Sequence, residues 1–172
     1  MDFQQTVQGA MGSLEQSVSK IPGYRGYKEK ETRREADKLV REFLVGRLDE
    51  QRRRLADIQR QMLDGGGLLM LDDVDRAVTK VQKLADMIRT ASYGYAGLFD
   101  AVKVKEGQLD ALYQFDNQML ERVTAVQTAV DALAAAQDAG GDVKTAIKGV
   151  VTAAEETNAR WRERENAITG AA

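Results

Sequence analysis

The acidic side chains that stand closest together in the chain are Asp72, Asp73 and Asp75. Carboxylate oxygens are the ligands that Mg²⁺ prefers, in an octahedral arrangement. On a helix, however, Asp72 and Asp75 share one face while Asp73 points elsewhere. Acidic residues in a first turn also stabilise the positive end of the helix dipole. We therefore interpret the three aspartates as the start of a helix and predict no metal site.

The chain contains neither cysteine nor histidine. Their absence removes thiol chemistry, the commonest zinc ligands and the commonest general base. It also removes a ferritin-type di-iron centre, which requires a Glu-x-x-His pair on each of two helices. The sequence therefore predicts no catalytic residue, no metal and no cofactor, and we expect a protein that is not an enzyme.

Two further patterns suggest phosphate binding and are explained more simply. The glycines at 65–67 are not followed by the Lys-Ser/Thr pair of a phosphate-binding loop, so they indicate a turn between helices. The arginines at 52–54 spread around a helix beside Asp49, Glu50 and Asp57, which indicates a salt-bridged solvent face. The net charge is −2 without a strongly basic region, and we expect no binding to nucleic acid.

Asp116 is the most unusual acidic residue, because it occupies an apolar position between Leu112 and Met119. A buried carboxylate is costly unless it is paired, and single polar residues in a helical seam often fix register or partner choice. We interpret Asp116 as such a specificity residue or as a partly exposed one. If Asp116 is buried there, its replacement by leucine is expected to raise the thermal stability of the protein.

Tyrosines gather in two glycine-containing segments, with Tyr24 and Tyr27 in the first and Tyr93, Tyr95 and the nearby Phe99 in the second. If the first two long helices form a hairpin, both segments lie toward the same end of the bundle. Tyrosine combines a large contact area with a polar tip, which suits interfaces. Two interpretations stay open: these side chains seal the end of the bundle, or they form a surface for a partner.

An apolar stripe runs along residues 2–21 and includes Phe3, Val7, Met11, Leu14 and Val18 at spacings of three and four. This spacing predicts a helix, and its other face is almost uncharged. Such helices can lie in a membrane interface. The stripe can equally pack on the bundle as a further helix or exchange into a partner subunit, and we favour packing.

The elements that position these residues are long helices, because Pro22 is the only proline and apolar residues recur at helical spacing. The pattern predicts helices over about 28–63, 72–91, 106–137 and 142–168, with Asp142 as the N-cap of the last. Pairs four residues apart in the favourable orientation, such as Asp37 with Arg41, add to the stability of the first long helix. The chain divides into an N-terminal amphipathic helix with a Gly/Tyr hinge (1–27) and a helical bundle (28–172).

The heptad rhythm continues in phase from Val74 to Leu133, which would allow one helix of roughly 65 residues and about 100 Å. Gly94, Gly97 and Gly107 together would cost such a helix about 3 kcal/mol. We therefore expect a break near residues 93–105 and a compact bundle whose neighbours are antiparallel through short loops.

These features predict an all-α protein: an antiparallel bundle of about four long, coiled-coil-like helices plus the N-terminal amphipathic helix. The expected function is that of a non-catalytic interaction or scaffold protein, which associates with itself or with protein partners because heptad seams readily pair between chains. The alternative is a peripheral membrane protein that uses residues 2–21 as a reversible anchor. The absence of a long apolar run predicts a cytoplasmic location, peripheral at the membrane under the alternative.

Overall fold

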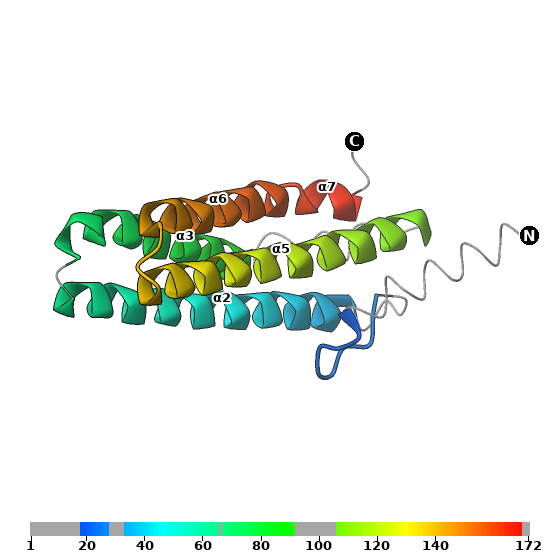
Figure 1. The fold of residues 1–172 in the computed structure, drawn as a ribbon. Coiled ribbons are helices and arrows are strands. Elements are labelled where there is room, and N and C mark those ends of the chain that lie inside the picture. Colours follow the sequence, from blue (N-terminus) through cyan, green and yellow to red (C-terminus); the bar gives the residue numbers. More distant parts are fainter. Residues whose placement is uncertain (1–17, 28–32, 66, 92–105, 170–172) are drawn as a thin grey trace, which may run out of the picture.

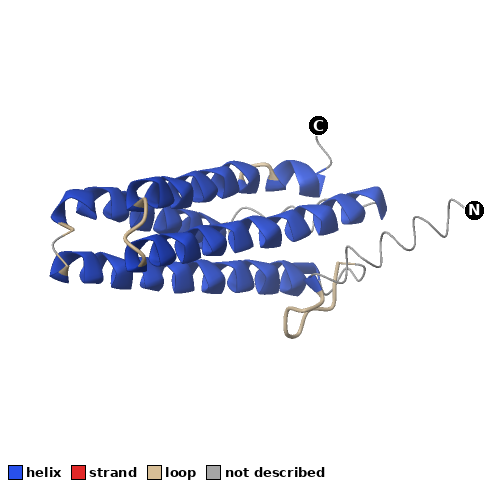
Figure 2. Cartoon of the chain, viewed as in Figure 1, coloured by secondary structure: helices blue, strands red, loops and turns tan. Residues whose placement is uncertain are grey.

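The structure is a computed structural model that describes residues 18–27, 33–65, 67–91 and 106–169. Within these ranges the chain forms helices and turns and no strand, which confirms the predicted all-α bundle (Figures 1 and 2). The elements are α2 (Arg33–Asp64), the 3-10 turn η2 (Leu68–Met70), α3 (Leu71–Thr90), α5 (Glu106–Asp138), α6 (Val143–Trp161) and α7 (Arg164–Thr169).

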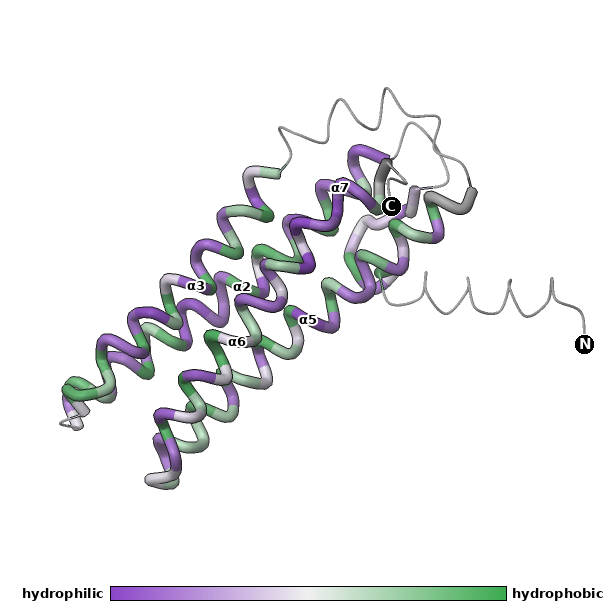
Figure 3. The backbone as a smooth tube through the Cα atoms, turned by 90° about the horizontal axis from the view of Figure 1, so that it is seen from above, coloured by the Kyte–Doolittle hydropathy of each residue, from purple (hydrophilic) through white to green (hydrophobic). Residues whose placement is uncertain are grey.

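The four long helices form two antiparallel hairpins, α2 with α3 and α5 with α6, packed side by side (Figure 3). Across the interface between the hairpins, α2 lies along α5 and α3 lies along α6. Arg47 bonds to Gln127 and Arg54 to Asp131, so residue numbers rise together and α2 runs parallel to α5. The predicted antiparallel pairing through short loops is confirmed within each hairpin. Between the hairpins like-directed helices become neighbours, because α3 and α5 lie on a diagonal.

Both hairpin turns lie at one end of the bundle, which we call the turn end (Figure 1). Residues 18–27, the start of α2 and α7 lie at the other end, the network end. Because α3 and α5 belong to the same bundle and run in opposite directions, they do not form one 100 Å helix. The predicted break at 93–105 falls on residues outside those described.

Local signals explain where the helices begin and end. Asp142 caps α6, as predicted, by accepting a hydrogen bond of 3.0 Å from the backbone N–H of Thr145. Gly140, which ends α5, has a φ of +63°, the left-handed conformation that glycine adopts without a steric penalty. The α2–α3 turn closes similarly, with the Gly67 N–H bonded to the Met62 carbonyl at 2.8 Å.

The last predicted helix is interrupted, so the expectation of one continuous helix over 142–168 is wrong. α6 ends at Trp161 and α7 begins at Arg164. Between them the N–H of Glu163 bonds to the carbonyl of Arg160 at 3.1 Å, a tighter turn than in an α-helix. Trp161 and Arg164, on either side of this turn, both lie in the interior, where each is at most 2% exposed.

The core consists of the apolar seam residues that the sequence pattern indicates. The buried side chains at these positions include Leu44, Leu48, Leu55, Val74, Val81, Leu84, Ile88, Met119, Val126, Val130, Ile147 and Val150. A second, smaller cluster at the network end joins Val18, Tyr27, Ala36, Leu112 and Tyr113. The heptad seams are thus satisfied within one chain. None of the described helices has the length and hydrophobicity needed to cross a membrane.

Candidate functional site

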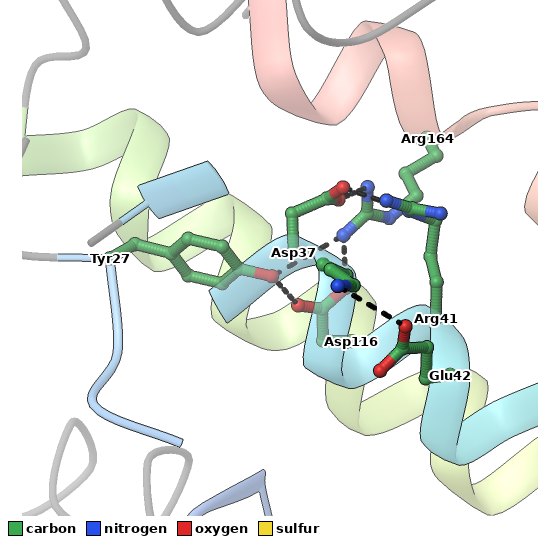
Figure 4. A network of polar contacts seen from close by, with 7 residues as sticks. Tyr27, Asp37, Arg41, Glu42, Asp116 and Arg164 are labelled. Carbon is green, nitrogen blue, oxygen red and sulfur yellow. Dashed lines mark hydrogen bonds and ion pairs between the residues drawn. The ribbon is translucent and has the colours of Figure 1, made fainter. Parts of the chain in front are cut away.

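A network of buried polar side chains connects four separate parts of the chain at the network end (Figure 4). We define this buried network as Tyr27, Asp37, Arg41, Asp116 and Arg164. At its centre lies Asp116 of α5, which accepts a hydrogen bond from the Tyr27 hydroxyl at 2.5 Å on Oδ2. Its other oxygen, Oδ1, accepts one from Arg164 of α7 at 3.0 Å. Both Asp116 and Arg164 are 0% exposed.

Asp37 of α2 is the second carboxylate of the buried network. It forms ion pairs with Arg164 and with Arg41, the latter at 2.8 Å between Oδ2 and Nε. One guanidinium, that of Arg164, therefore joins Asp37 on α2 to Asp116 on α5. The two carboxylates and the two guanidiniums balance in charge, which is the arrangement that makes buried ions tolerable.

Tyr27 is held by its backbone as well as by its hydroxyl. Its N–H donates to the Tyr113 hydroxyl at 2.8 Å, and its carbonyl accepts from Nε of Arg33 at 2.7 Å. Its ring packs against that of Tyr113, with centroids 5.4 Å apart. The buried network thereby fixes the segment 18–27 onto α2 and α5.

Burial and charge act on the pKa values of this site in opposite senses. Burial raises the pKa of Asp116, and the charge of Arg164 and the hydrogen bond from Tyr27 partly offset this. Burial alone would lower the pKa of Arg164, but the Asp116 and Asp37 carboxylates hold it well above its usual range. The pKa of Tyr27 is raised well above 10.0, first by burial and then by the Asp116 charge. Tyr27 therefore stays a proton donor.

The chemistry open to the buried network is limited by its closure. Both oxygens of Asp116 accept hydrogen bonds from side chains of the network, and the tyrosine that approaches it is held protonated. A general base or nucleophile must reach a substrate atom, and Asp116, Arg164 and Tyr27 are all 0% exposed. Among the described residues, no group of three or more acidic side chains is placed to hold a metal ion. The arrangement favours a structural role.

The sequence pattern indicated Asp116 and missed its partners. The Asp37–Arg41 pair was predicted from its spacing and is confirmed, and the structure buries both side chains. Arg164 follows Trp161 by three residues, which places both on the same helix face, and this signal was overlooked. In the structure Arg164 remains on the interior side after the turn between α6 and α7.

The residues predicted to form a partner surface or an apolar stripe are buried to different degrees where the structure describes them. Tyr27 is fully buried, so its assignment to a partner surface is corrected: its hydroxyl is used within the chain. Val18 is also 0% exposed, because it packs in the small cluster around Tyr27. Tyr24 is half-buried against the core. The remaining predicted residues of these two sets, Phe3, Val7, Met11, Leu14, Tyr93, Tyr95 and Phe99, lie outside the described residues.

The large hydrophobic side chains that are exposed in the described ranges all lie at the turn end. Leu63, Leu68 and Leu69 are 50%, 64% and 94% exposed, and we call them the leucine turn. Beside them a cleft of about 540 Å³, whose lining includes Met62, Met70 and Val143, separates the two hairpin turns. The sequence pattern assigned this segment only to a turn. Its signal was the apolar run that starts at Leu68 directly after the glycines.

A second surface feature lies between α3 and α6, close to the turn end. This groove of about 700 Å³ has Ile147 and Val151 along its floor. Four basic side chains line it: Arg76 and Lys80 on α3, and Lys144 and Lys148 on α6. We call it the basic groove. Lys80 forms an ion pair of 2.6 Å with Glu155, whereas the other three basic side chains have no ion pair with another described residue.

The arginines at 52–54 confirm the predicted salt-bridged face. Arg54 pairs with Asp131 at 2.5 Å, and Arg52 lies 3.9 Å from Asp49.

Comparison with protein-family models, with curated proteins and with solved structures finds no match to this chain.

Proposed function

We propose that this protein is a non-catalytic helical-bundle interaction protein that binds protein partners, including a second copy of itself, through its turn end. One observation carries the proposal: Leu68 and Leu69 expose 64% and 94% of their surface on a short turn at the end of a long bundle. Exposed apolar groups that cluster, with polar residues around them, are typical of interaction surfaces.

The long charged helices support this choice of surface. The heptad seams pack inside the chain, so they are not free to pair with another chain in the folded state. Much of the described outer surface carries ion pairs between exposed residues, such as Arg89 with Asp49 and Arg122 with Glu156. Such pairs add little to affinity. The apolar leucine turn is therefore the strongest candidate contact.

The buried network has a supporting role in this proposal. It joins α2, α5, α7 and the segment 18–27 in one set of hydrogen bonds at the network end. A binding surface gains affinity when its scaffold is rigid before binding. The network holds the helices in register, so that the two hairpin turns at the opposite end keep a fixed relation.

The test is site-specific photo-cross-linking in the native cell, with a photoreactive phenylalanine at position 69 of the full chain. Position 121, an exposed site in the middle of α5, serves as the control. We expect covalent adducts with one or a few proteins from position 69 and none of these from position 121. The same adducts from both positions, or no protein adduct from position 69, would reject the proposal.

The membrane-anchor alternative now depends on the part of the stripe that precedes Val18. Val18 and Ile21 are 0% and 4% exposed within the bundle and are not available to a lipid surface in this fold. Co-sedimentation with liposomes distinguishes the two functions. We expect the full chain and a Phe3→Ser/Met11→Ser variant to stay equally in the supernatant, whereas lipid binding lost in the variant would favour the anchor.

A further inference from the structure

The leucine turn is surrounded by acidic residues. Asp64 ends α2, and Asp72 and Asp75 lie in the first turns of α3; all three are exposed. None of the three forms an ion pair with another residue in the part of the chain that the structure describes. The turn end therefore presents the apolar leucine turn with a negatively charged rim. Such a rim opposes binding to anionic lipid surfaces.

The basic groove has the opposite charge and a matching apolar floor. Arg76, Lys144 and Lys148 are exposed and without ion pairs among the described residues, while Ile147 and Val151 lie between them at the base. Asp73 also lines the groove, so with the Lys80–Glu155 pair neutral the groove carries a net charge of about +2. It suits an occupant that is apolar at its centre and acidic at its edge.

The described part of this chain contains an occupant of that composition: the leucine turn itself. Arg76 follows Leu69 by seven residues, which is about 10 Å along a helix, so the leucine turn and the basic groove are adjacent in one copy. Two copies can meet about a two-fold axis at their turn ends, with the leucine turn of one against the basic groove of the other. The symmetry then places the second leucine turn against the second groove. The same complementary contact is then formed twice, as in an isologous dimer.

We propose that a second copy of the chain docks at the turn end, with the leucine turn of each copy in the basic groove of the other. The inference rests on the proposed function and names the surface of the second copy that receives the leucine turn. The leucines supply buried apolar area, and the opposed charges select the orientation and make association weaker as salt increases.

The test uses the full chain in sedimentation equilibrium over a range of concentrations. We expect dimerisation of the wild type to weaken with added salt. Leu68→Ser/Leu69→Ser and Lys144→Glu/Lys148→Glu should each weaken it by at least about tenfold. Arg53→Glu/Arg162→Glu is the matched control, since it makes the same charge change at exposed positions outside the groove and should leave dimerisation unchanged.

A charge exchange gives the sharpest result. The Asp64→Lys/Asp72→Lys variant should be monomeric on its own, because the rim of its leucine turn is then basic and faces a basic groove. When it is mixed with the Lys144→Glu/Lys148→Glu variant, the two should form a heterodimer, because each leucine turn then meets a groove of opposite charge. Circular dichroism melts check that each variant is folded. We expect all of them to fold, because every substituted side chain is exposed.

Two outcomes overturn the inference: a wild type that is monomeric up to about 1 mM, or a dimer that the groove and leucine variants leave intact. Neither outcome decides the proposed function. A monomeric chain whose position 69 still cross-links to a different protein retains the function and loses the second copy as its partner. A chain with no protein adduct at position 69 loses both.

Discussion

Tyr27 and Asp116 are 89 positions apart in the chain, and the Tyr27 hydroxyl donates a 2.5 Å hydrogen bond to the Asp116 carboxylate in the interior of the bundle. The same carboxylate binds Arg164, 48 positions further on. One side chain of α5 therefore organises both the segment before α2 and the last helix. Hydrogen bonds to a charged acceptor are stronger than neutral ones, so Tyr27 and Arg164 each help to hold the Asp116 carboxylate in the interior.

The first prediction concerns Asp116→Leu, which we expect to destabilise the fold by about 3–5 kcal/mol, because Arg164 would remain charged in the interior with one carboxylate partner fewer. This reverses the direction that the sequence pattern predicted for a buried Asp116, because the pattern did not reveal its partners Arg164 and Tyr27. Urea unfolding followed by circular dichroism measures the change. Asp131→Leu is the control: Asp131 is 52% exposed in its pair with Arg54, and its loss should cost less than about 1 kcal/mol. Unchanged or increased stability of Asp116→Leu would contradict the role of the buried network.

The second prediction concerns pH and Tyr27→Phe. The pKa of Tyr27 is raised above its ordinary value in the folded state, so folding favours the protonated hydroxyl. That contribution is complete below the unfolded pKa near 10 and is lost as pH rises above it. At neutral pH, Tyr27→Phe should cost about 1.5–3 kcal/mol, the range for a hydrogen bond to a charged group.

Above about pH 10, the difference between wild type and Tyr27→Phe should shrink, because the wild type alone loses this contribution. Unfolding free energies measured at several alkaline pH values check it. The other tyrosines and the lysines titrate in both proteins and cancel in the difference. A difference that stays constant through this range would show that Tyr27 is not linked to folding by its proton.

The third prediction concerns coupling between Arg164 and Asp116. Arg164→Met leaves Asp116 and Asp37 without their shared partner and should cost several kcal/mol, as for one half of a buried ion pair. The double variant with Asp116→Leu should cost clearly less than the two single losses added together, with a coupling above about 1 kcal/mol. Arg162→Met, at an exposed position of the same turn, should show no such coupling. Additive losses would place the two residues in independent sites.

The fourth prediction compares two glycines with opposite outcomes. Gly140 has a φ of +63°, and no atom lies within 4 Å of the place that a Cβ would take. Gly140→Ala is therefore strained by backbone conformation alone and should cost about 1–2 kcal/mol. Gly149 lies inside α6 with equally open surroundings, and Gly149→Ala should stabilise by about 0.5–1 kcal/mol. Thermal melts of the two variants check the signs. Equal shifts for both would contradict the left-handed turn after α5.

The sequence was sufficient to predict the helices because their signals are local. Spacings of three and four place Val74, Ala77 and Val81 on one face, and a cap such as Asp142 acts on the N–H groups three residues away. The same locality explains the errors. The turn after Trp161 contains neither proline nor glycine, so no local pattern marks the end of α6.

The sequence by itself determined that this protein is all-α, that Asp116 interrupts an apolar seam, and that histidine and cysteine chemistry is absent, since each follows from residue type and short-range periodicity. The tertiary structure alone decided that Asp116 is satisfied by Tyr27 and Arg164, that α2 and α5 run parallel, and that Leu68 and Leu69 remain exposed. These features depend on which helices become neighbours, and that choice rests on the sum of many long-range contacts rather than on any local pattern.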